Sequence, residues 1–368
     1  MKLAVFPFMD KNRYGELLYG ALSGHGIEAV PEAKLDPRWL WRHRGEVTFL
    51  HFHWDRYFYD STVSGPRLRE CLSWLKLVYF ALLLMLGRAL GYRIIWTVHE
   101  VVPHEARNPR RDVLAGRLLA RLSHALICHD DATAHRAEAV LGIPSERFAV
   151  IPHGSYLGVY PEGRPRCAVR REFGYDDSVF VLLAFGNLRS YKRLDLLLDA
   201  FLSVPSPDVR LLITGQFEWR FRDVEWEQRT VSQLRLAAAH DPRIRYRIER
   251  VPDEQVAELH GAADAAVFAR TDGWTSGSLI LALSQGVPVL APRLPAYAEL
   301  LGPEDAGWLY EPGSVPSLAD TISRAARERA QVPAKVTEAR RRAQQLAWDE
   351  IATATASVML SSLPGGRP

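Results

Sequence analysis

The sequence TDGWTSGS at residues 271–278 runs directly into the apolar segment LILALSQG at residues 279–286. Small residues stand where a loop becomes a helix, and a buried-strand pattern follows at residues 287–290. A helix start carries unpaired N–H groups and a partial positive charge, so Ser276, Gly277 and Ser278 could bind a phosphate. An ordinary helix capped by a serine is the alternative interpretation.

Composition indicates a soluble globular protein of two domains. The chain has 368 residues, of which 48% are hydrophobic and 24% charged, and its formal net charge is +3. This charge is too small to indicate a nucleic-acid partner. Residues 1–165 carry a surplus of four positive charges, which fits either an anionic or membrane-surface partner or an ordinary mixed surface. Three cysteines without metal-binding spacing favour a reducing cytoplasm.

One helical segment, residues 72–90, is strongly hydrophobic. Its uncharged part covers only residues 77–87, whereas a membrane span needs about 20 apolar residues. We interpret it as a core helix, or at most as a helix that touches a membrane from one side.

The remaining pattern alternates strands and helices, which predicts an α/β fold with parallel sheets. The alternation breaks at residues 156–178, where two prolines and a glycine indicate a linker. We predict a first domain over residues 1–160, a linker over 161–178, a second domain over 179–345 and a terminal helix over 346–368. The predicted strands are residues 3–8, 46–52, 93–98, 125–128 and 148–151, then 179–185, 209–214, 243–248, 265–268 and 287–290.

Parallel sheets bind ligands beyond the carboxyl ends of their strands. Polar residues follow most of the predicted strands at this edge. In the first domain they are Asn12, His51, His53, His99 and His153. In the second domain they are residues 186–193, Gly215, Gln216, Arg250 and the loop 272–278.

A second phosphate candidate lies at residues 186–193, GNLRSYKR. A glycine ends the strand, and Arg189 and Lys192 precede an amphipathic helix. Two cations directed at a pyrophosphate would neutralise its charge when the bond to it breaks. Together with the serine–glycine helix start, they predict an anion site built from two sides, although solvated loop cations are the alternative for this segment alone.

This combination of segments resembles the group 1 glycosyltransferases, a large retaining family with the GT-B fold. The resemblance rests on an ordered set that spans most of the chain: residues 185–201, Gly-Val-Pro-Val at 286–289, IWTVHE at 95–100 with PHE at 103–105, VIPHG at 150–154 and LAWDEIA at 346–352. It implies two Rossmann-like domains facing across a cleft, with the terminal helix crossing back to the first domain.

The resemblance also implies roles for particular residues. Arg189, Lys192, Ser276, Gly277 and Ser278 would hold the donor diphosphate, while His99 would lie near the donor sugar and Asp272 would reach it. We further predict donor contacts at Gly186, Asn187, Gln216, Arg250 and His153, and acceptor contacts at Asn12, His53 and Trp54.

The chain departs from the family at two positions. The family has two glutamates eight positions apart around the phosphate loop, and the matching positions here hold Gly273 and Leu281. Neither side chain accepts a hydrogen bond, so Asp272 is the nearest replacement on the sugar side.

The predicted function is transfer of a sugar from a nucleotide-sugar donor, such as a UDP- or GDP-sugar, to a glycan, lipid-linked or small-molecule acceptor. The resemblance implies retention, no metal and no other cofactor. We expect a cytoplasmic protein, with peripheral contact at the inner face of the membrane as one interpretation of the basic first half. A nucleotide-sugar epimerase and a non-catalytic nucleotide-sugar binding protein are the alternatives. No Gly-x-Gly-x-x-Gly follows the first strand, which disfavours a nicotinamide enzyme.

Overall fold

A computed structural model describes residues 1–7, 12–102, 106–217 and 223–365. The chain divides into two compact units. The first consists of residues 1–154 and 346–368, and the second of residues 155–345. The segment 161–178, which the sequence predicts as a linker, contains a helix and belongs to the second unit. The PHE segment at residues 103–105 lies outside the described residues.

The first unit is built on a six-stranded sheet with the order β2-β1-β3-β4-β5-β6. All neighbouring strands pair in parallel. Apolar runs such as VTFLHF in β3 form strands that are covered on both faces, which is typical of parallel sheets. The strands are β1 (Lys2–Phe6), β2 (Glu28–Val30), β3 (Val47–Phe52), β4 (Arg93–Val98), β5 (Ala125–Cys128) and β6 (Phe148–Val150).

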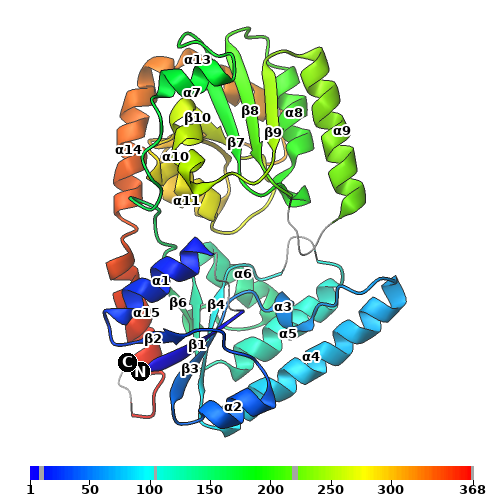
Figure 1. The fold of residues 1–368 in the computed structure, drawn as a ribbon, viewed down its shortest axis with the longest axis vertical. Coiled ribbons are helices and arrows are strands. Elements are labelled where there is room, and N and C mark those ends of the chain that lie inside the picture. Colours follow the sequence, from blue (N-terminus) through cyan, green and yellow to red (C-terminus); the bar gives the residue numbers. More distant parts are fainter. Residues whose placement is uncertain (8–11, 103–105, 218–222, 366–368) are drawn as a thin grey trace. The chain divides into compact units, whose positions relative to one another are not determined.

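Helices cover both faces of this sheet (Figure 1). Their starts follow local capping rules, for example at Asn12, Asp36 and Asp130, whose side chains accept backbone N–H groups of the first turn. The helices are α1 (Arg13–Ser23), α2 (Pro37–His43), α3 (Arg56–Tyr59), α4 (Pro66–Ala89), α5 (Pro109–Leu122), α6 (Asp131–Leu141) and the 3-10 turn η1 (Ser145–Arg147).

The last helix of the chain, α15 (Trp348–Ser361), packs on the first unit beside α1. Its apolar side chains Ile351, Ala352, Ala356 and Met359 join the core formed by α1 and the sheet. Gly154 marks the tightest contact, because a Cβ there would lie 2.2 Å from the ring of Trp348. The terminal helix therefore returns to the first unit, as the sequence predicts.

The second unit also contains six parallel strands, in the order β12-β11-β10-β7-β8-β9. Counted from β7, this is the strand order of the dinucleotide-binding Rossmann fold. The strands are β7 (Phe180–Phe185), β8 (Val209–Gly215), β9 (Ile244–Ile248), β10 (Ala265–Val267), β11 (Val289–Pro292) and β12 (Gly307–Tyr310).

Two apolar cores lie on the two faces of this sheet. The apolar side chains of α8, LDLLLDAFL, contribute to one of them, and those of α11 contribute to the other. The helices are α7 (Arg166–Glu172), α8 (Leu194–Leu202), α9 (Val224–His240), α10 (Asp253–Ala262), α11 (Gly277–Ser284), α12 (Pro295–Leu301), α13 (Val315–Arg327) and α14 (Val332–Gln344), with the 3-10 turns η2 (Ser190–Lys192) and η3 (Arg329–Gln331).

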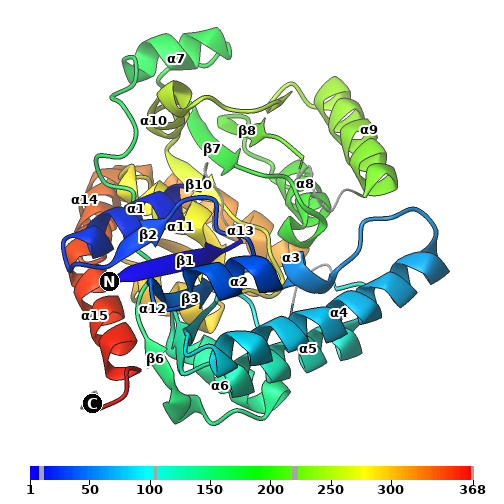
Figure 2. The same ribbon diagram turned by 60° about the horizontal axis from the view of Figure 1, so that its bottom comes forward.

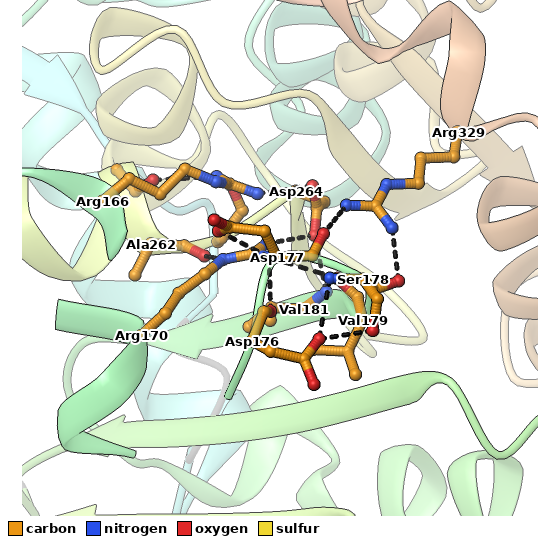
Figure 3. A network of polar contacts seen from close by, with 12 residues as sticks. Arg166, Arg170, Asp176, Asp177, Ser178, Val179, Val181, Ala262, Asp264 and Arg329 are labelled. Atoms are coloured by element: carbon orange, nitrogen blue, oxygen red, sulfur yellow. Dashed lines mark hydrogen bonds and ion pairs between the residues drawn. The ribbon is translucent and has the colours of Figure 1, made fainter. Parts of the chain in front are cut away.

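A network of arginines attaches α7 to this unit (Figure 3). The buried Arg170 donates to the Asp264 carboxylate at 2.5 Å and to the carbonyl oxygen of Ala262. Arg166 donates to the other oxygen of Asp264 at 2.6 Å. Asp264 also accepts the backbone N–H of Val181, so a single carboxylate fastens α7 to β7 and to the end of α10. Arg329 adds bonds to the carbonyl oxygens of Asp177 and Ser178.

Most predicted elements are present, with ends that differ by a few residues. The elements β2, α2, α3, α7, α12 and β12 lack a counterpart in the sequence prediction. They are short, with three to seven residues each, and too short for a periodic pattern to separate them from loops.

Candidate active site

In the second unit, β7 and β10 lie side by side although other strands separate them in sequence. The chain leaves them in opposite directions across the sheet, which makes this the switch point where such folds bind ligands. The loop after β7 carries residues 186–193 and the loop after β10 carries residues 268–276. Both phosphate candidates found in the sequence therefore belong to one place.

Three cations gather at this switch point. Arg189, Lys192 and Arg270 line the same small cavity. The guanidinium of Arg270 lies 4.7 Å from the ring centre of Tyr191, and that of Arg189 lies 5.5 Å from it. Burial, followed by the positive charges of Arg270 and Arg189, lowers the pKa of Lys192 to about 7. Three cations close together in a partly buried site repel one another, so the site favours binding of a polyanion.

Gly186 connects the two phosphate candidates. Its φ angle is +100°, and a Cβ on it would lie 3.5 Å from Ser278 Oγ and 3.6 Å from Lys192 Nζ. The hydroxyl of Ser278 and the ammonium of Lys192 thus approach the same point of backbone from different loops. The two-sided anion site predicted from the sequence is consistent with this arrangement.

The start of α11 forms one side of the site. Ser276 is its N-cap, and its side chain accepts the N–H of Leu279 at 3.4 Å. The hydroxyl of Ser276 therefore caps the helix, in agreement with the alternative interpretation of this serine. Gly277 and Ser278 occupy the first helical positions, where N–H groups have no partner within the helix and can receive an anion.

Sequence reasoning missed Arg270, which follows β10 and is 6% exposed. A Cβ at Gly273 would lie 3.0 Å from the guanidinium of Arg270. The position at which the family carries a glutamate is therefore a glycine that accommodates this arginine. The guanidinium also donates to Tyr297 Oη at 3.0 Å and to the carbonyl oxygen of Asp272. The sequence signal for this role was the placement of Arg270 three positions before Gly273, the glycine that stands in place of a family glutamate.

The other predicted donor residues of this unit differ in their placement. Gln216 Nε2 lies 3.5 Å from Asn187 Oδ1, which joins the loops after β7 and β8. Leu281, which stands at the second position where the family carries a glutamate and was not predicted as a contact, is buried in α11. Asp272 and Arg250 are exposed within the loops after β10 and β9, and Arg250 does not line the cavity that holds the three cations.

In the first unit, the corresponding switch point lies between β1 and β3. A cavity of about 210 Å³ opens there. Asn12, His53 and Trp54, the three predicted acceptor contacts, all line it together with Tyr14 and Tyr19. Apolar rings with a few polar groups suit a sugar ring, which stacks on aromatic faces through its C–H groups.

A hydrogen-bonded chain of four histidines and one tyrosine extends from this cavity along the edge of the sheet. Thr97 Oγ1 lies 2.8 Å from His51 Nε2, and Tyr19 Oη lies between His51 Nδ1 and His53 Nε2. His53 Nδ1 then lies 2.9 Å from His99 Nε2. His99 Nδ1 lies 3.2 Å from His129 Nε2, and His129 Nδ1 lies 3.0 Å from the carbonyl oxygen of Ile151.

The carbonyl of Ile151 fixes the direction of this chain. A carbonyl oxygen can only accept, so Nδ1 of His129 carries the hydrogen and Nε2 of a neutral ring accepts. The same assignment follows at His99, His53 and His51 in turn, with Tyr19 donating to His53 and Thr97 donating to His51. Burial lowers the pKa of His51 to about 3 and also lowers the pKa values of His53, His99 and His129, which keeps the rings neutral.

Both ring nitrogens of His99 are thus bonded to other histidines. The ring of His99 stacks on Trp54 at 4.5 Å, with an angle of 9° between the planes. His153, predicted as a donor contact, belongs to the same group of aromatic rings. It lies 4.8 Å from the ring of Tyr14, and its Nδ1 bonds to the carbonyl oxygen of Gly154.

No group of three or more His, Cys, Asp or Glu side chains placed to hold a metal ion occurs among the residues that the structure describes. The positive charge near the phosphate candidates comes from Arg189, Lys192 and Arg270.

Two family models match this chain. One, described as glycosyl transferases group 1, matches residues 167–344, and one, described as glycosyltransferase family 4, matches residues 71–155. With these two matches, the chain bears out its resemblance to the group 1 glycosyltransferases. It is a nucleotide-sugar-dependent glycosyltransferase, as the sequence predicts.

This glycosyltransferase is similar to two proteins of Xanthomonas campestris pathovar campestris, both called GDP-mannose:glycolipid 4-beta-D-mannosyltransferase. The identities are 29% over 309 residues and 28% over 306 residues. Each match covers 83% of this chain and 76% of the relative.

Solved structures show the same GT-B fold. HepE of Anabaena in complex with UDP-glucose has a TM-score of 0.74 at 18% identity, and the match covers 98% of this chain and 99% of that one. Sucrose-phosphate synthase of Thermosynechococcus elongatus also has a TM-score of 0.74, at 17% identity, covering 97% and 98% of the two chains. WaaG, a glycosyltransferase involved in lipopolysaccharide biosynthesis, has a TM-score of 0.65 at 15% identity, covering 98% and 99%.

Proposed function

We propose that this glycosyltransferase transfers mannose from GDP-mannose to a glycolipid acceptor. The observation that carries the proposal is the match to two GDP-mannose:glycolipid mannosyltransferases over 83% of the chain. The three cations at the switch point of the second unit support it, since a nucleoside diphosphate is the polyanion that such a donor presents.

In the proposed donor site, Arg189, Lys192 and Arg270 neutralise the diphosphate, and the start of α11 donates backbone N–H groups to it. This positive charge has its largest effect when the sugar–phosphate bond breaks and the leaving diphosphate gains negative charge. We also propose Asp272 and His99 as sugar contacts. A sugar hydroxyl at His99 would replace one of the two histidine hydrogen bonds described above.

The acceptor is proposed to bind in the cavity of the first unit. Trp54, Tyr14, Asn12 and His53 border this space, and the half-buried indole of Trp54 is the ring proposed to stack on a sugar. Trp54→Ala should raise KM for the acceptor about 2- to 12-fold, and more than KM for the donor, because a stacked aromatic contact contributes about 0.5–1.5 kcal/mol. An equal rise in both KM values would contradict this placement.

We propose that transfer needs neither a metal ion nor another cofactor. The support is the set of three cationic side chains, which supply the positive charge that a divalent ion would bring to the diphosphate. The rate should be the same after dialysis against EDTA and after addition of Mg²⁺ or Mn²⁺ at roughly 5 mM. Loss of activity in EDTA that Mn²⁺ restores would contradict the proposal.

Two indications disagree about whether the anomeric configuration of the sugar is retained or inverted. The family resemblance implies retention, whereas the names of the two relatives specify a β-linked mannoside. Mannose is α-linked in GDP-mannose, so a β-mannoside requires inversion. We propose inversion because these relatives match most of this chain. The one-bond carbon–hydrogen coupling at the anomeric centre of the product measures the outcome, and an α-mannoside would establish retention.

Inversion by direct displacement requires a base for the acceptor hydroxyl, and we propose Asp55. It follows Trp54 directly, and burial together with Glu100 and Asp112 raises the pKa of its carboxyl to about 7. A base with this pKa accepts a proton efficiently near neutral pH. At saturating donor, kcat/KM for the acceptor should rise with pH through about 7, and Asp55→Asn should remove both this rise and most of kcat.

The first experiment is a thermal-shift screen with GDP, UDP, dTDP, ADP and their sugars. A ligand present at about 100 times its Kd stabilises the native state by about 2.7 kcal/mol. GDP and GDP-mannose should give the largest shifts. The structure of HepE with UDP-glucose makes a UDP-sugar the second candidate, and a shift with UDP alone would favour it.

Mannose transfer to a panel of octyl glycosides then tests the reaction itself. A mannosylated product supports the proposal. Conversion of the donor sugar without any acceptor would favour an epimerase, and binding without turnover would favour a nucleotide-sugar binding protein.

We also propose that the protein is cytoplasmic and that its first unit contacts the membrane surface. A glycolipid acceptor lies in a bilayer, and the basic surplus of residues 1–165 supports contact with anionic lipid.

A further inference from the structure

Helix α4 presents an apolar face to solvent. It is 24 residues long, and among the described residues it is the one helix that is apolar and long enough to qualify as a membrane span. Only a third of its most apolar window is buried inside the protein. In both views it lies along the periphery of the first unit beside α5 and α2 (Figures 1 and 2).

The inner face of α4 accounts for its docking on the first unit. Ser73, Leu77, Phe80, Leu84 and Gly87 are buried there. Gly87 packs so closely that a Cβ on it would lie 3.1 Å from Leu50 of the sheet. The helix cannot leave the unit to cross a bilayer without exposing this core, so its outer face needs a separate explanation.

The outer face consists of large apolar side chains at helical spacing. Each of them is between 38% and 60% exposed: Leu68, Trp74, Leu75, Val78, Tyr79, Leu82 and Met85. At 3.6 residues per turn they fall within one arc of the helix, and at about 1.5 Å per residue they extend over roughly 26 Å. A contiguous apolar surface of this kind on a soluble unit marks a contact with lipid or with another protein.

Charge favours lipid as the occupant. Lys76 and Arg88 lie on opposite sides of the apolar arc and both are exposed, although Nη1 of Arg88 also donates to the carbonyl oxygen of Leu122 at 2.6 Å. Such cations can reach lipid headgroups while the apolar face enters the acyl region. Glu70, the one acidic residue of α4, bonds to Arg111 and Asn108 of the α5 region instead.

The neighbouring helix α2 extends the basic surface. It packs against α4 and exposes Trp41, with Arg44 stacked 3.7 Å above the ring. Arg38 and Arg42 are both exposed on the same short helix. Tryptophan and arginine side chains suit the headgroup region, where one part of the side chain meets apolar chains and the other meets phosphate.

We propose that α4 lies in the plane of an anionic bilayer, with its apolar outer face inserted and Lys76, Arg88 and the arginines of α2 bound to phosphate groups. The proposal rests on the proposed function in one respect: a glycolipid acceptor explains why the protein meets a bilayer. The outer face of α4 is the surface through which the first unit would contact the membrane.

Vesicle sedimentation tests the proposal without donor or acceptor. The wild-type protein should bind vesicles of phosphatidylcholine and phosphatidylglycerol (about 7:3) at least roughly tenfold better than vesicles of phosphatidylcholine alone, and about 0.5 M NaCl should weaken binding. The double variant Leu75→Glu, Leu82→Glu should bind the mixed vesicles at least roughly tenfold more weakly. Both positions are more than half exposed, so the fold should tolerate the change.

Leu236→Glu is the matched control. Leu236 lies on α9 of the second unit and is 60% exposed, the same fraction as Leu75. It should bind vesicles like the wild type, and thermal melting should show that all variants are folded. Absence of wild-type binding, or equal binding by the double variant, would overturn the proposal.

Two further measurements separate this proposal from its alternatives. If light scattering shows a wild-type dimer that the double variant converts to a monomer, and vesicles are not bound, α4 pairs with a second copy and the proposal is wrong. Transfer to a water-soluble octyl glycoside should be the same in the double variant and the wild type. Failure of that transfer in both, with vesicle binding intact, would refute the proposed function and leave the membrane surface standing.

Discussion

Among single residues, the cations of the second unit carry the clearest functional signal. Arg189 and Lys192 come from the loop after β7, and Arg270 comes from the loop after β10. Each is an ordinary loop cation in the sequence. Their meeting at one cavity is electrostatically unfavourable, because like charges repel most strongly where water is scarce. A bound diphosphate relieves this repulsion.

Arg270→Ala should weaken binding of GDP about 10- to 100-fold, since a charge-assisted hydrogen bond contributes roughly 1.5–3 kcal/mol. Isothermal titration calorimetry measures the change. Arg193→Ala is the control, because Arg193 lies at the end of the loop that carries Arg189 and Lys192 but pairs with Asp195 and does not line the cavity. Equal losses in the two variants would indicate a general effect of charge and not a phosphate contact.

Lys192 should take up a proton when a nucleoside diphosphate binds. Its pKa is lowered to about 7 in the unliganded protein, so at pH 8 most molecules carry a neutral amine. A nearby diphosphate favours the charged form and raises this pKa. Affinity should therefore fall as the pH rises above about 7.

Calorimetry at about pH 8 in two buffers of different ionisation enthalpy counts the protons taken up, and the expected number approaches one. Lys192→Arg should bind GDP with no uptake, because arginine stays charged throughout this range. Undiminished uptake in that variant would assign the proton to another group.

Among the helices and strands, the contact between Gly154 and α15 determines how the end of the chain is held. The ring of Trp348 occupies the space in which any side chain at position 154 would stand. Residues 150–154 and 346–352 are both recognisable in the sequence as segments of the family pattern. Their contact forms only when the first unit has folded.

Gly154→Ala should destabilise the first unit by about 1–3 kcal/mol, because the added methyl group overpacks against a large ring. Gly20→Ala is the matched control. Gly20 lies within α1, and a Cβ on it would meet no atom within 4 Å, so alanine there should stabilise by about 0.5–1 kcal/mol. Chemical denaturation measures both changes, and trypsin should release the C-terminal helix faster only in Gly154→Ala.

For the molecule as a whole, the histidine chain makes stability depend on pH. The pKa values of His51, His53, His99 and His129 are all lower in the folded protein than the usual value of 6.5. Below about pH 6.5 the unfolded chain therefore binds protons that the native state rejects. The stabilisation is present above this pH and is lost as the pH falls, by at most about 1.4 kcal/mol per histidine for each pH unit.

Thermal unfolding between about pH 5 and pH 8 measures this dependence, and Tm should fall steeply below about pH 6.5. His51→Gln should reduce the slope, because glutamine can accept and donate in the chain but does not titrate. His135→Ala should leave it unchanged, since His135 is exposed on α6 and its Nδ1 bonds to the carbonyl oxygen of Asp131 in its own helix. A slope that is identical in all three proteins would contradict the assignment to the histidine chain.

The return of the terminal helix was implied by the resemblance to the family at residues 346–352. Local sequence patterns were sufficient to predict the two Rossmann-like halves and the strand ends at which the candidate functional residues lie. Strands β4 and β5 have the predicted bounds. These features follow from periodicity and from the rule that parallel strands place their carboxyl ends at one edge. Short elements such as α7 depend instead on distant partners, here Asp264.

Only the folded structure shows that Arg270 lies with Arg189 and Lys192. It alone also shows that four histidines from three adjacent strand ends form one directed chain of hydrogen bonds. Side-chain direction beyond a strand depends on loop geometry, which residue spacing does not encode. The sequence also could not show which apolar side chains of α4 remain uncovered. Both faces of that helix are apolar, so the pattern is the same whether protein packs on one side or on both; the fold covers one face and leaves the other to solvent.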